Sequence, residues 1–418
     1  MHEVRQIREE EYRDNVILHE QAYTANPASS EEEIEKLVKQ EKEFLAQAEG
    51  VVPYGVFKDD KLIGSMKLFD FEMNVFGSFL PTGGLSSVGV DLLHKKERVA
   101  KTLVDFYLDY FDQRGYALAA LYAFRPDFYY QMGFGYGLKK DVYTIAPHAF
   151  PNFKHKADLD FLTKEDDQAL VDCYNAFAEQ QHGLMKKSLF QYKRAFEKFN
   201  IKVVGVKKKG KLTGYAIFSF KERQDTNNFL SSNIIVHEFV YTDKDALQQL
   251  STFFHSQKDQ VHRISFPTQD ETIHHFFTDA RDGSDELINF VYHQTNRAGL
   301  GLMYRVINVK RFFDQLSKHN FNNANYTITF QVTDTMYPKN AGDVTVRFTN
   351  GKPAVIQGAK ADTTIKIDVS DLSSLVLGVV DFEKLHLYDK VTVSNEAHVN
   401  TINEIFYTRH KPISMTDF

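Results

Sequence analysis

A ten-residue segment occurs twice in this sequence, and this repeat constrains the fold more than any other feature. Residues 55–64 read GVFKDDKLIG and residues 205–214 read GVKKKGKLTG, so six of the ten positions are identical. In both copies two apolar runs flank a polar turn, which is the pattern of a β-hairpin. A strand, an amphipathic helix and another strand are expected after each hairpin. The repeat therefore predicts a duplicated mixed α/β unit.

Other segments complete the predicted organisation. Residues 30–48 are expected to form a helix, because Ser30 and Glu33 match a capping box and apolar residues follow at helical spacing. From about residue 306 short strands and helices alternate, and Asn350-Gly351 is a typical type I′ hairpin turn. At about 150 residues per domain, 418 residues correspond to three domains. We expect them at 1–150, 151–305 and 306–418.

The composition excludes several classes of protein. Fifty basic and 56 acidic residues give a net charge of −6, which argues against general binding to nucleic acid or anionic lipid. Cys173 is the one cysteine, so no disulfide framework is expected and a reducing compartment fits. No apolar run approaches the ~20 residues of a membrane span. We expect a soluble cytoplasmic protein with no nucleic-acid or membrane partner.

A basic loop lies between the strand expected at 85–90 and the helix expected at 99–111. It contains Lys95, Lys96 and Arg98, and Lys101 follows in the first helical turn. A helix amino terminus has unpaired N–H groups and a positive dipole end, so basic residues beside it make an anion site suited to phosphate. Taken alone, the loop is equally well explained as an exposed surface segment.

A more specific pattern follows at residues 128–134, FYYQMGF, in which Tyr129 precedes Gly133-Phe134. The order of strand, basic loop, helix, strand and this turn resembles the Gcn5-related N-acetyltransferase (GNAT) superfamily. The whole chain resembles its Eis-type (enhanced intracellular survival) branch. That resemblance implies two tandem GNAT folds and a sterol-carrier-protein-like α+β domain. It also implies acetyl-CoA as co-substrate, no metal, and a homo-oligomer, which is a hexamer in the relatives.

The resemblance assigns roles to individual residues. Tyr129 would be the general acid, since a phenol with a pKa near ~10 is protonated at neutral pH. The α-carboxylate of the last residue, Phe418, would be the base, with the ring anchored in an apolar pocket. The acetyl-CoA contacts would come from Val88, Gly89 and Val90 for the pantetheine arm, Lys95, Lys96, Arg98, Val99, Ala100 and Lys101 for the phosphates, and Phe124 and Arg125 on the next strand.

Two features depart from the family pattern. The phosphate loop usually has glycine where this chain has Arg98, whose side chain either adds charge or obstructs the backbone approach. In the second copy the equivalent loop contains Asp243 and Asp245, which would repel a pyrophosphate. We therefore expect the second copy to be a degenerate scaffold.

The predicted function is transfer of an acetyl group from acetyl-CoA to a primary amine, such as an aminoglycoside- or polyamine-like substrate, by direct attack in a ternary complex. Two alternatives remain open at this level. The third domain could carry a lipid or another hydrophobic ligand in a protein without catalytic activity. The chain could also be a long-chain acyl-CoA N-acyltransferase, because N-myristoyltransferases share tandem folds and a C-terminal carboxylate base.

Overall fold

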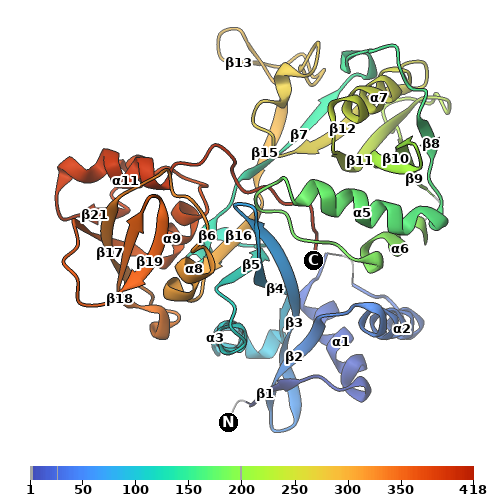
Figure 1. The fold of residues 1–418 in the computed structure, drawn as a ribbon. Helices are drawn as coiled ribbons and strands as arrows, with labels where there is room; N and C mark the ends of the chain where they lie inside the picture. The colour runs from blue at the N-terminus through green and yellow to red at the C-terminus, as the bar shows by residue number, and fades with distance from the viewer. Residues whose placement is uncertain (1–2, 26, 198–199) are drawn as a thin grey trace. The chain divides into compact units, whose positions relative to one another are not determined.

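The computed structural model describes residues 3–25, 27–197 and 200–418 (Figure 1). By its internal contacts the chain divides into two compact units, and each combines sheets with helices. The first unit contains the chain up to Gly137, Leu302–Pro412 and Asp417–Phe418. The second unit contains Leu138–Gly301 and Ile413–Thr416.

The amino-terminal part of the first unit is a mixed sheet with helices on both faces. In spatial order its strands are β1 (Glu3–Gln6), β2 (Val51–Lys58), β3 (Lys61–Val75), β4 (Ser78–Val90), β5 (Leu118–Tyr122), β16 (Leu302–Val306) and β6 (Gly135–Tyr136). Its helices are α1 (Tyr12–Ala22), α2 (Glu31–Gln47), α3 (Val99–Gln113) and α4 (Pro126–Tyr130). His19 of α1 bonds to Ser65 of β3, whereas a Cβ on the adjacent Gly64 would meet Val99 of α3. Neighbouring strand residues point to opposite faces, so α1 and α3 cover opposite faces of the sheet.

The helix α3 forms because apolar side chains recur along one of its faces. The buried residues of this helix are Val99, Leu103, Val104, Tyr107, Leu108 and Phe111. Burying side chains of this size contributes roughly 1.5–3 kcal/mol each. The Tyr107 hydroxyl also donates a hydrogen bond to the Gly83 carbonyl of β4 at 2.8 Å. These contacts fix α3 against β4, and with it the loop that joins the two.

The sequence-based element predictions hold for most of this sheet. The helix expected at 30–48 is α2, and Ser30 caps it by accepting a hydrogen bond from the Glu33 N–H at 3.3 Å. The repeat hairpin is β2–β3, and the expected helix at 99–111 is α3. The helix α1 was not predicted, because polar residues interrupt its apolar stripe.

The two units exchange strands relative to the predicted domain borders at 150 and 305. The strand β7 (Lys139–Ile145) follows the first sheet directly but pairs with β12 and β15 of the second unit. The strand β16 follows the second unit but pairs with β5 and β6 of the first sheet. The chain therefore changes sheet at Leu138 and Leu302. Local periodicity could not reveal this, because the partners are distant in sequence.

The second unit repeats the plan of the first sheet, so the structure confirms the predicted duplication. Its strands in spatial order are β15 (Asn296–Leu300), β7, β12 (Val261–Thr268), β11 (Ser232–Tyr241), β10 (Lys211–Glu222), β9 (Ile201–Lys208) and β8 (Leu159–Phe161). Its helices are α5 (Asp167–Ala178), α6 (Leu189–Glu197) and α7 (Lys244–His255). The second copy of the hairpin is β9–β10, and β11 and β12 are parallel, as β4 and β5 are.

The carboxy-terminal part of the first unit is a smaller α+β body, as predicted. Its sheet runs β19 (Lys352–Ile356), β18 (Gly342–Thr349), β17 (Tyr326–Thr333), β20 (Thr363–Asp368) and β21 (Val391–Val393). Its helices are α8 (Val309–Gln315), α9 (Val369–Val376), α10 (Phe382–Leu387) and α11 (Val399–Phe406). Asn350 and Gly351 have φ of +50° and +78°, which is the left-handed backbone of the expected type I′ turn.

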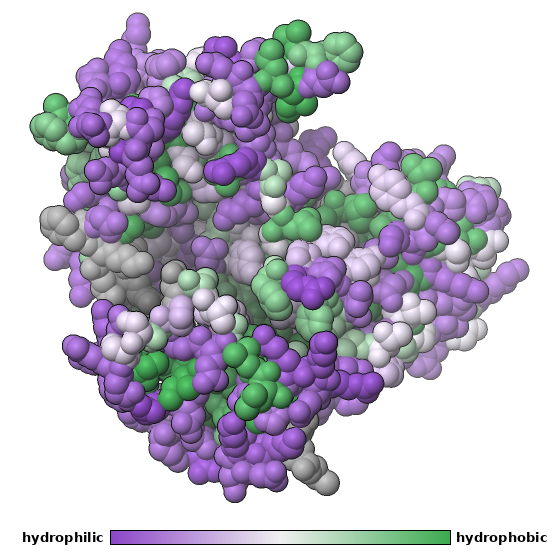
Figure 2. Space-filling model, turned by 180° about the vertical axis from the view of Figure 1, so that it is seen from behind, coloured by the Kyte–Doolittle hydropathy of each residue, from purple (hydrophilic) through white to green (hydrophobic). Residues whose placement is uncertain are grey.

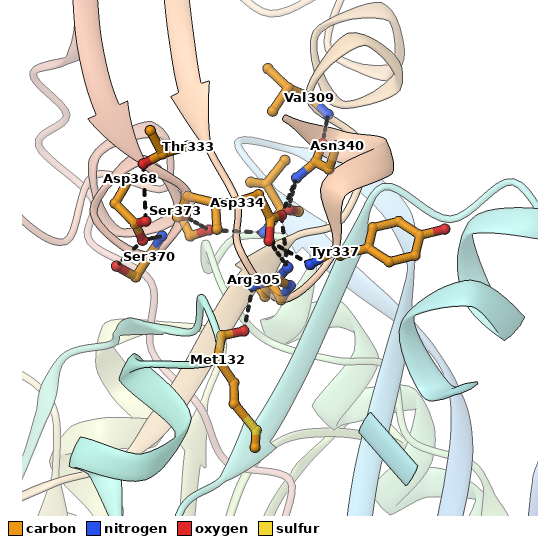
Figure 3. Close-up of polar contacts among 12 residues, drawn as sticks. Met132, Arg305, Val309, Thr333, Asp334, Tyr337, Asn340, Asp368, Ser370 and Ser373 are labelled. Atoms are coloured by element: carbon orange, nitrogen blue, oxygen red, sulfur yellow. Dashed lines mark hydrogen bonds and ion pairs between the residues drawn. The ribbon is translucent and has the colours of Figure 1, made fainter. Parts of the chain in front are cut away.

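A buried ion pair joins the two parts of the first unit (Figure 3). Arg305 of β16 donates to both carboxylate oxygens of Asp334 at 2.7 Å, and neither side chain is exposed. Asp334 also accepts from the Tyr337 N–H at 2.8 Å and from the Asn340 amide at 3.1 Å. Arg305 donates a further hydrogen bond to the Met132 carbonyl. The ion pair therefore connects the end of β17 to the turn after α4.

The glycine of the sequence motif at 128–134 has a structural role in this connection. Gly133 has φ of +83°, and a Cβ built on it would lie 1.5 Å from Arg305 Nη1. Both the left-handed backbone and the close approach of the guanidinium exclude a larger residue.

A short hairpin of the second unit presents apolar side chains to solvent. It is formed by β13 (Leu287–Ile288) and β14 (Tyr292–His293), with Phe290 and Val291 in its turn 82% and 77% exposed. Figure 2 shows these hydrophobic side chains projecting from the surface. Among the described residues, no helix combines the length and the apolar character needed to cross a membrane.

We predict that Gly133→Ala destabilises the protein by more than the cost of left-handed backbone alone. Gly115→Ala is the matched control, because Gly115 has φ of +85° but no atom within 4 Å of a built Cβ. The control should lose about 1–2 kcal/mol of unfolding free energy, and Gly133→Ala should lose several kcal/mol. Urea denaturation measures both, and equal losses would contradict the role given to the Arg305 contact.

Candidate active site

The loop between β4 and α3 passes twice through left-handed backbone. Asp91 begins it and caps the 3₁₀ turn Leu92–His94 by accepting from the Leu93 N–H at 2.8 Å. Lys96 and Arg98 then have φ of +69° and +64°. This conformation suits glycine and costs another residue about 1–2 kcal/mol. Arg98 therefore keeps the backbone path of a glycine, and its side chain is exposed.

The amino terminus of α3 is open to an anion. Arg98 is its N-cap residue and makes no side-chain hydrogen bond to the first turn, which begins with Val99 and Ala100. The N–H groups of that turn therefore lack the partner that a serine or aspartate cap would supply. The exposed cations around this end are Lys95, Lys96, Arg98 and Lys101. None of them forms an ion pair within the part of the chain that the structure describes.

The equivalent helix of the second unit is closed by its own side chains. Asp243 caps α7 and accepts from the Ala246 N–H at 2.8 Å. Asp245 pairs with Lys208 at 2.6 Å. A carboxylate thus occupies the position where an anion would bind, as expected from the two aspartates in this loop.

The strand β4 has an open edge beside the α3 loop. Its pairing with β5 ends at Leu85, and its pairing with β3 is interrupted by a bulge at Ser87, which has φ of +53°. Beyond the bulge Gly89 pairs with Ser65, and Asp91 N–H bonds to the Ile63 carbonyl at 2.9 Å.

The backbone N–H and C=O groups of successive residues point to opposite edges of a strand. This alternation determines which residues of the segment direct their backbone groups toward the open edge. Gly89 and Asp91 direct their groups into the ladder with β3. Val88 and Val90 therefore direct theirs toward the open edge. Of the three residues expected to contact the pantetheine arm, Val88 and Val90 have the matching orientation. Gly89 instead provides space, because a Cβ on it would lie 2.7 Å from Leu18 of α1.

Tyr129 lies in α4 with its side chain buried in the core of the first unit. Burial raises the pKa of its hydroxyl well above the ordinary value, and the nearby Tyr23 raises that pKa further. The hydroxyl has no hydrogen-bond partner among the residues that the structure describes. Tyr130 differs, since its hydroxyl donates to both carboxylate oxygens of Asp371 at 2.9 Å. The Tyr129 hydroxyl makes no such bond, so of this pair it is the one available to donate a proton.

Two expected contact residues, Phe124 and Arg125, lie between the end of β5 at Tyr122 and the start of α4 at Pro126. The Phe124 ring is 70% exposed and meets the Tyr129 ring edge-on, with centroids 6.2 Å apart. The Arg125 guanidinium pairs with Asp127 at 2.5 Å, and both side chains are exposed. Phe124 therefore offers an apolar surface near Tyr129, whereas the charge of Arg125 is already compensated.

The ring of Phe418 lies in an aromatic pocket of the first unit. Its centroid is 4.8 Å from that of Phe71 and 5.5 Å from those of Phe69 and Tyr122. Tyr122 is the last residue of β5, so this pocket borders the region where β4 and β5 separate. The α-carboxylate of Phe418 forms no ion pair or hydrogen bond with any described residue.

The structure adds His19 of α1 and Tyr23, the residue directly after this helix, which the sequence did not indicate. The Tyr23 hydroxyl donates to the Val88 carbonyl at 2.9 Å. His19 lies against Tyr23, with ring centroids 5.7 Å apart, and bonds to the Ser65 hydroxyl at 2.9 Å. Burial lowers the pKa of His19 to about 4, so it is neutral at pH 7. No motif marks these residues, because their significance depends on how α1 packs against β4.

Three domain families match the chain. Residues 3–137 and residues 183–306 each match an acetyltransferase (GNAT) domain, and residues 309–415 match a sterol carrier protein domain. No curated protein sequence matches. The chain is therefore an acetyltransferase of the GNAT class with two such domains and a sterol carrier protein domain.

Solved structures share this organisation over their full length. A GCN5-related N-acetyltransferase from Anabaena variabilis is 16% identical with a TM-score of 0.81, and both chains are covered completely. A probable N-acyltransferase from Enterococcus faecalis is 18% identical with a TM-score of 0.79 at the same coverage. Eis1 from Mycobacterium abscessus is 19% identical with a TM-score of 0.78, again over 100% of both chains. These likenesses show that the chain has the fold of two GNAT domains followed by a sterol carrier protein domain, as these solved structures do.

We predict that Arg98→Gly stabilises the protein. Relief of left-handed strain outweighs the greater freedom of glycine in the unfolded chain, so the free energy of unfolding should rise by roughly 0.5–1 kcal/mol. Lys95→Gly in the same loop is the control, because Lys95 has an ordinary φ of −59° and should lose stability on substitution. Both are measured by urea denaturation. A loss of stability in Arg98→Gly would show that the arginine side chain makes a stabilising contact.

Proposed function

We propose that the chain transfers the acetyl group of acetyl-CoA to a primary amine, of aminoglycoside- or polyamine-like chemistry, by direct attack in a ternary complex. The observation that carries this proposal is the open edge of β4 next to the uncapped, cation-rich amino terminus of α3. A strand edge offers N–H and C=O groups to the amides of the pantetheine arm. The helix terminus and its lysines offer N–H groups and positive charge to the pyrophosphate. The second unit lacks this combination at α7.

The reaction needs one bond to form and one to break. The amine nitrogen attacks the thioester carbonyl carbon, and the carbonyl oxygen takes the negative charge of a tetrahedral intermediate. An N–H group on the open edge of β4, from Val88 or Val90, would stabilise that oxyanion. The C–S bond then breaks, the carbonyl re-forms as an amide, and the CoA thiolate leaves.

Tyr129 would protonate the departing thiolate. The raised pKa of the phenol keeps it protonated at neutral pH. The same burial favours the uncharged form of a thiol, so a thiolate formed beside Tyr129 is a stronger base than it is in water. Burial therefore raises both pKa values, which are about 10 and 8.5 in water, and the thiolate becomes a stronger base while Tyr129 becomes a weaker acid.

The Phe418 α-carboxylate would accept the proton that the amine loses. Its ordinary pKa, about 3.3–3.7, leaves it ionised at neutral pH. The three aromatic rings around the Phe418 side chain support this role, because they anchor the terminal residue beside the end of β5.

We predict that Tyr129→Phe lowers the turnover of acetyl-CoA with an amine substrate by ~10²–10⁴-fold. The substitution keeps the ring and its packing but removes the proton donor, so the Kd for acetyl-CoA should change little. A thiol-release assay over a panel of amines measures turnover, and calorimetry measures binding. Normal turnover in Tyr129→Phe would contradict the assignment.

Tyr130→Phe is the matched control for this experiment. It removes a neighbouring hydroxyl that bonds to Asp371 and lies outside the proposed proton path. Turnover should be retained, while the melting temperature falls because a buried carboxylate loses its partner.

A second prediction concerns the position of the terminal carboxylate. Adding one glycine after Phe418 keeps the aromatic anchor but moves the charge by up to ~3.6 Å. Direct proton transfer needs a heavy-atom separation of about 2.6–3.2 Å, so amine acetylation should fall at least tenfold while acetyl-CoA still binds. Phe418→Ala keeps the chain length but removes the anchor, and a similar loss is expected. Wild-type rates in both variants would exclude the carboxylate as the base.

The structure offers one observation on the lipid-binding alternative. A cavity of about 230 Å³ in the first unit is lined by Phe76, His319, Asn320, Phe321, Asn322, Val376, Ile405, Phe406, Tyr407, Thr408 and Arg409. Pockets for drug-sized ligands measure roughly 300–1,000 Å³, so this cavity is small for a lipid chain.

The long-chain acyltransferase alternative is tested by comparing acetyl-CoA with myristoyl-CoA in the thiol-release assay. The homo-oligomer, a hexamer by resemblance, and the cytoplasmic location stay predictions.

A further inference from the structure

The hydrogen bond from the Tyr23 hydroxyl uses a backbone carbonyl of the open β4 edge, that of Val88. Of the β4 residues beyond the bulge, Val88 and Val90 direct their backbone groups away from β3. The Val88 carbonyl already has a partner, the Tyr23 hydroxyl at 2.9 Å. Tyr23 thus holds an acceptor that an added strand or an extended ligand would otherwise use.

Tyr23 lies outside the sheet and is partly exposed. It is the C-cap residue of α1, directly beyond the last helical residue, and its side chain is 48% exposed. Its ring stacks on His19, whose own hydrogen bond to Ser65 holds the imidazole in place. The pKa of Tyr129 responds to Tyr23, which places the two phenols in the same neighbourhood.

We infer that Tyr23 competes with the pantetheine arm for the Val88 carbonyl, so that its hydroxyl lowers the affinity for acyl-CoA. This inference rests on the proposed function. A carbonyl oxygen can accept two hydrogen bonds, so competition requires that the Tyr23 hydroxyl takes the lone pair that an amide N–H of the arm would use, and that this hydroxyl is displaced when the arm binds. Acyl-CoA binding therefore includes the loss of one protein hydrogen bond, and it releases a hydroxyl near Tyr129.

The experiment compares two ligands by calorimetry on the intact chain. Acetyl-CoA carries the pantetheine arm, whereas adenosine 3′,5′-bisphosphate carries nucleotide phosphates without the arm. In Tyr23→Phe the Kd for acetyl-CoA should fall by roughly two- to tenfold, the net worth of one hydrogen bond. The Kd for adenosine 3′,5′-bisphosphate should not change. Tyr12→Phe is the control on the same helix, because Tyr12 packs with Ile7 and Phe57 away from this edge. It should alter neither Kd.

The outcomes separate this inference from the function on which it rests. If the wild-type chain binds acetyl-CoA but Tyr23→Phe binds it equally or more weakly, competition by Tyr23 is excluded and the acetyltransferase proposal stands. Tighter binding of both ligands would also exclude it, because the effect would not depend on the arm. Failure of the wild-type chain to bind acetyl-CoA would overturn both proposals.

Discussion

The buried ion pair between Arg305 and Asp334 is the interaction on which the first unit depends. Moving a charged group out of water costs several kcal/mol even after relaxation, so the pair depends on additional hydrogen bonds. Asp334 accepts them from Tyr337 and Asn340, and Arg305 donates one to the Met132 carbonyl, whereas the Arg305 Nε has no partner among the described residues. Because Met132 lies in the turn after α4, the position of Tyr129 is coupled electrostatically to the strand β16 and to the sterol carrier protein domain.

The same pair explains why one motif residue is glycine. In the sequence, Gly133 stands out only as part of the FYYQMGF pattern around Tyr129. In the structure this glycine makes room for a guanidinium that arrives from a strand about 170 residues later (305 − 133 = 172). Packing between the first GNAT domain and the sterol carrier protein domain therefore requires a glycine here, and the turn that Gly133 permits follows directly after Tyr129 and Tyr130.

Much of the fold could be predicted from the sequence, because its signals are local. The repeated hairpin, the capped helix α2 and the type I′ turn at Asn350 each depend on neighbouring residues. Within the site, the basic loop and Tyr129 were found through motif spacing. The strand exchange of β7 and β16 and the contact of Tyr23 with Val88 depend on partners far away in sequence. Such contacts produce no periodic pattern in the sequence. The backbone of Arg98 is an intermediate case, because the sequence identified the departure from glycine but could not decide its conformation.

The strand exchange also has a kinetic consequence for the order of folding. Arg305 of β16 pairs with Ala119 of β5, a separation of 186 residues, and the Leu138–Gly301 part of the second unit is synthesised in between. During that interval one edge of β5 lacks its strand partner, and exposed strand edges promote aggregation. The Gly137 N–H bonds to the Leu302 carbonyl at 3.1 Å, so the chain leaves and re-enters the first sheet at adjacent points. Residues 138–301 are thus an insertion between strands of the first sheet. When this insertion folds, its two ends come closer together, and the entropy cost of pairing β16 with β5 falls.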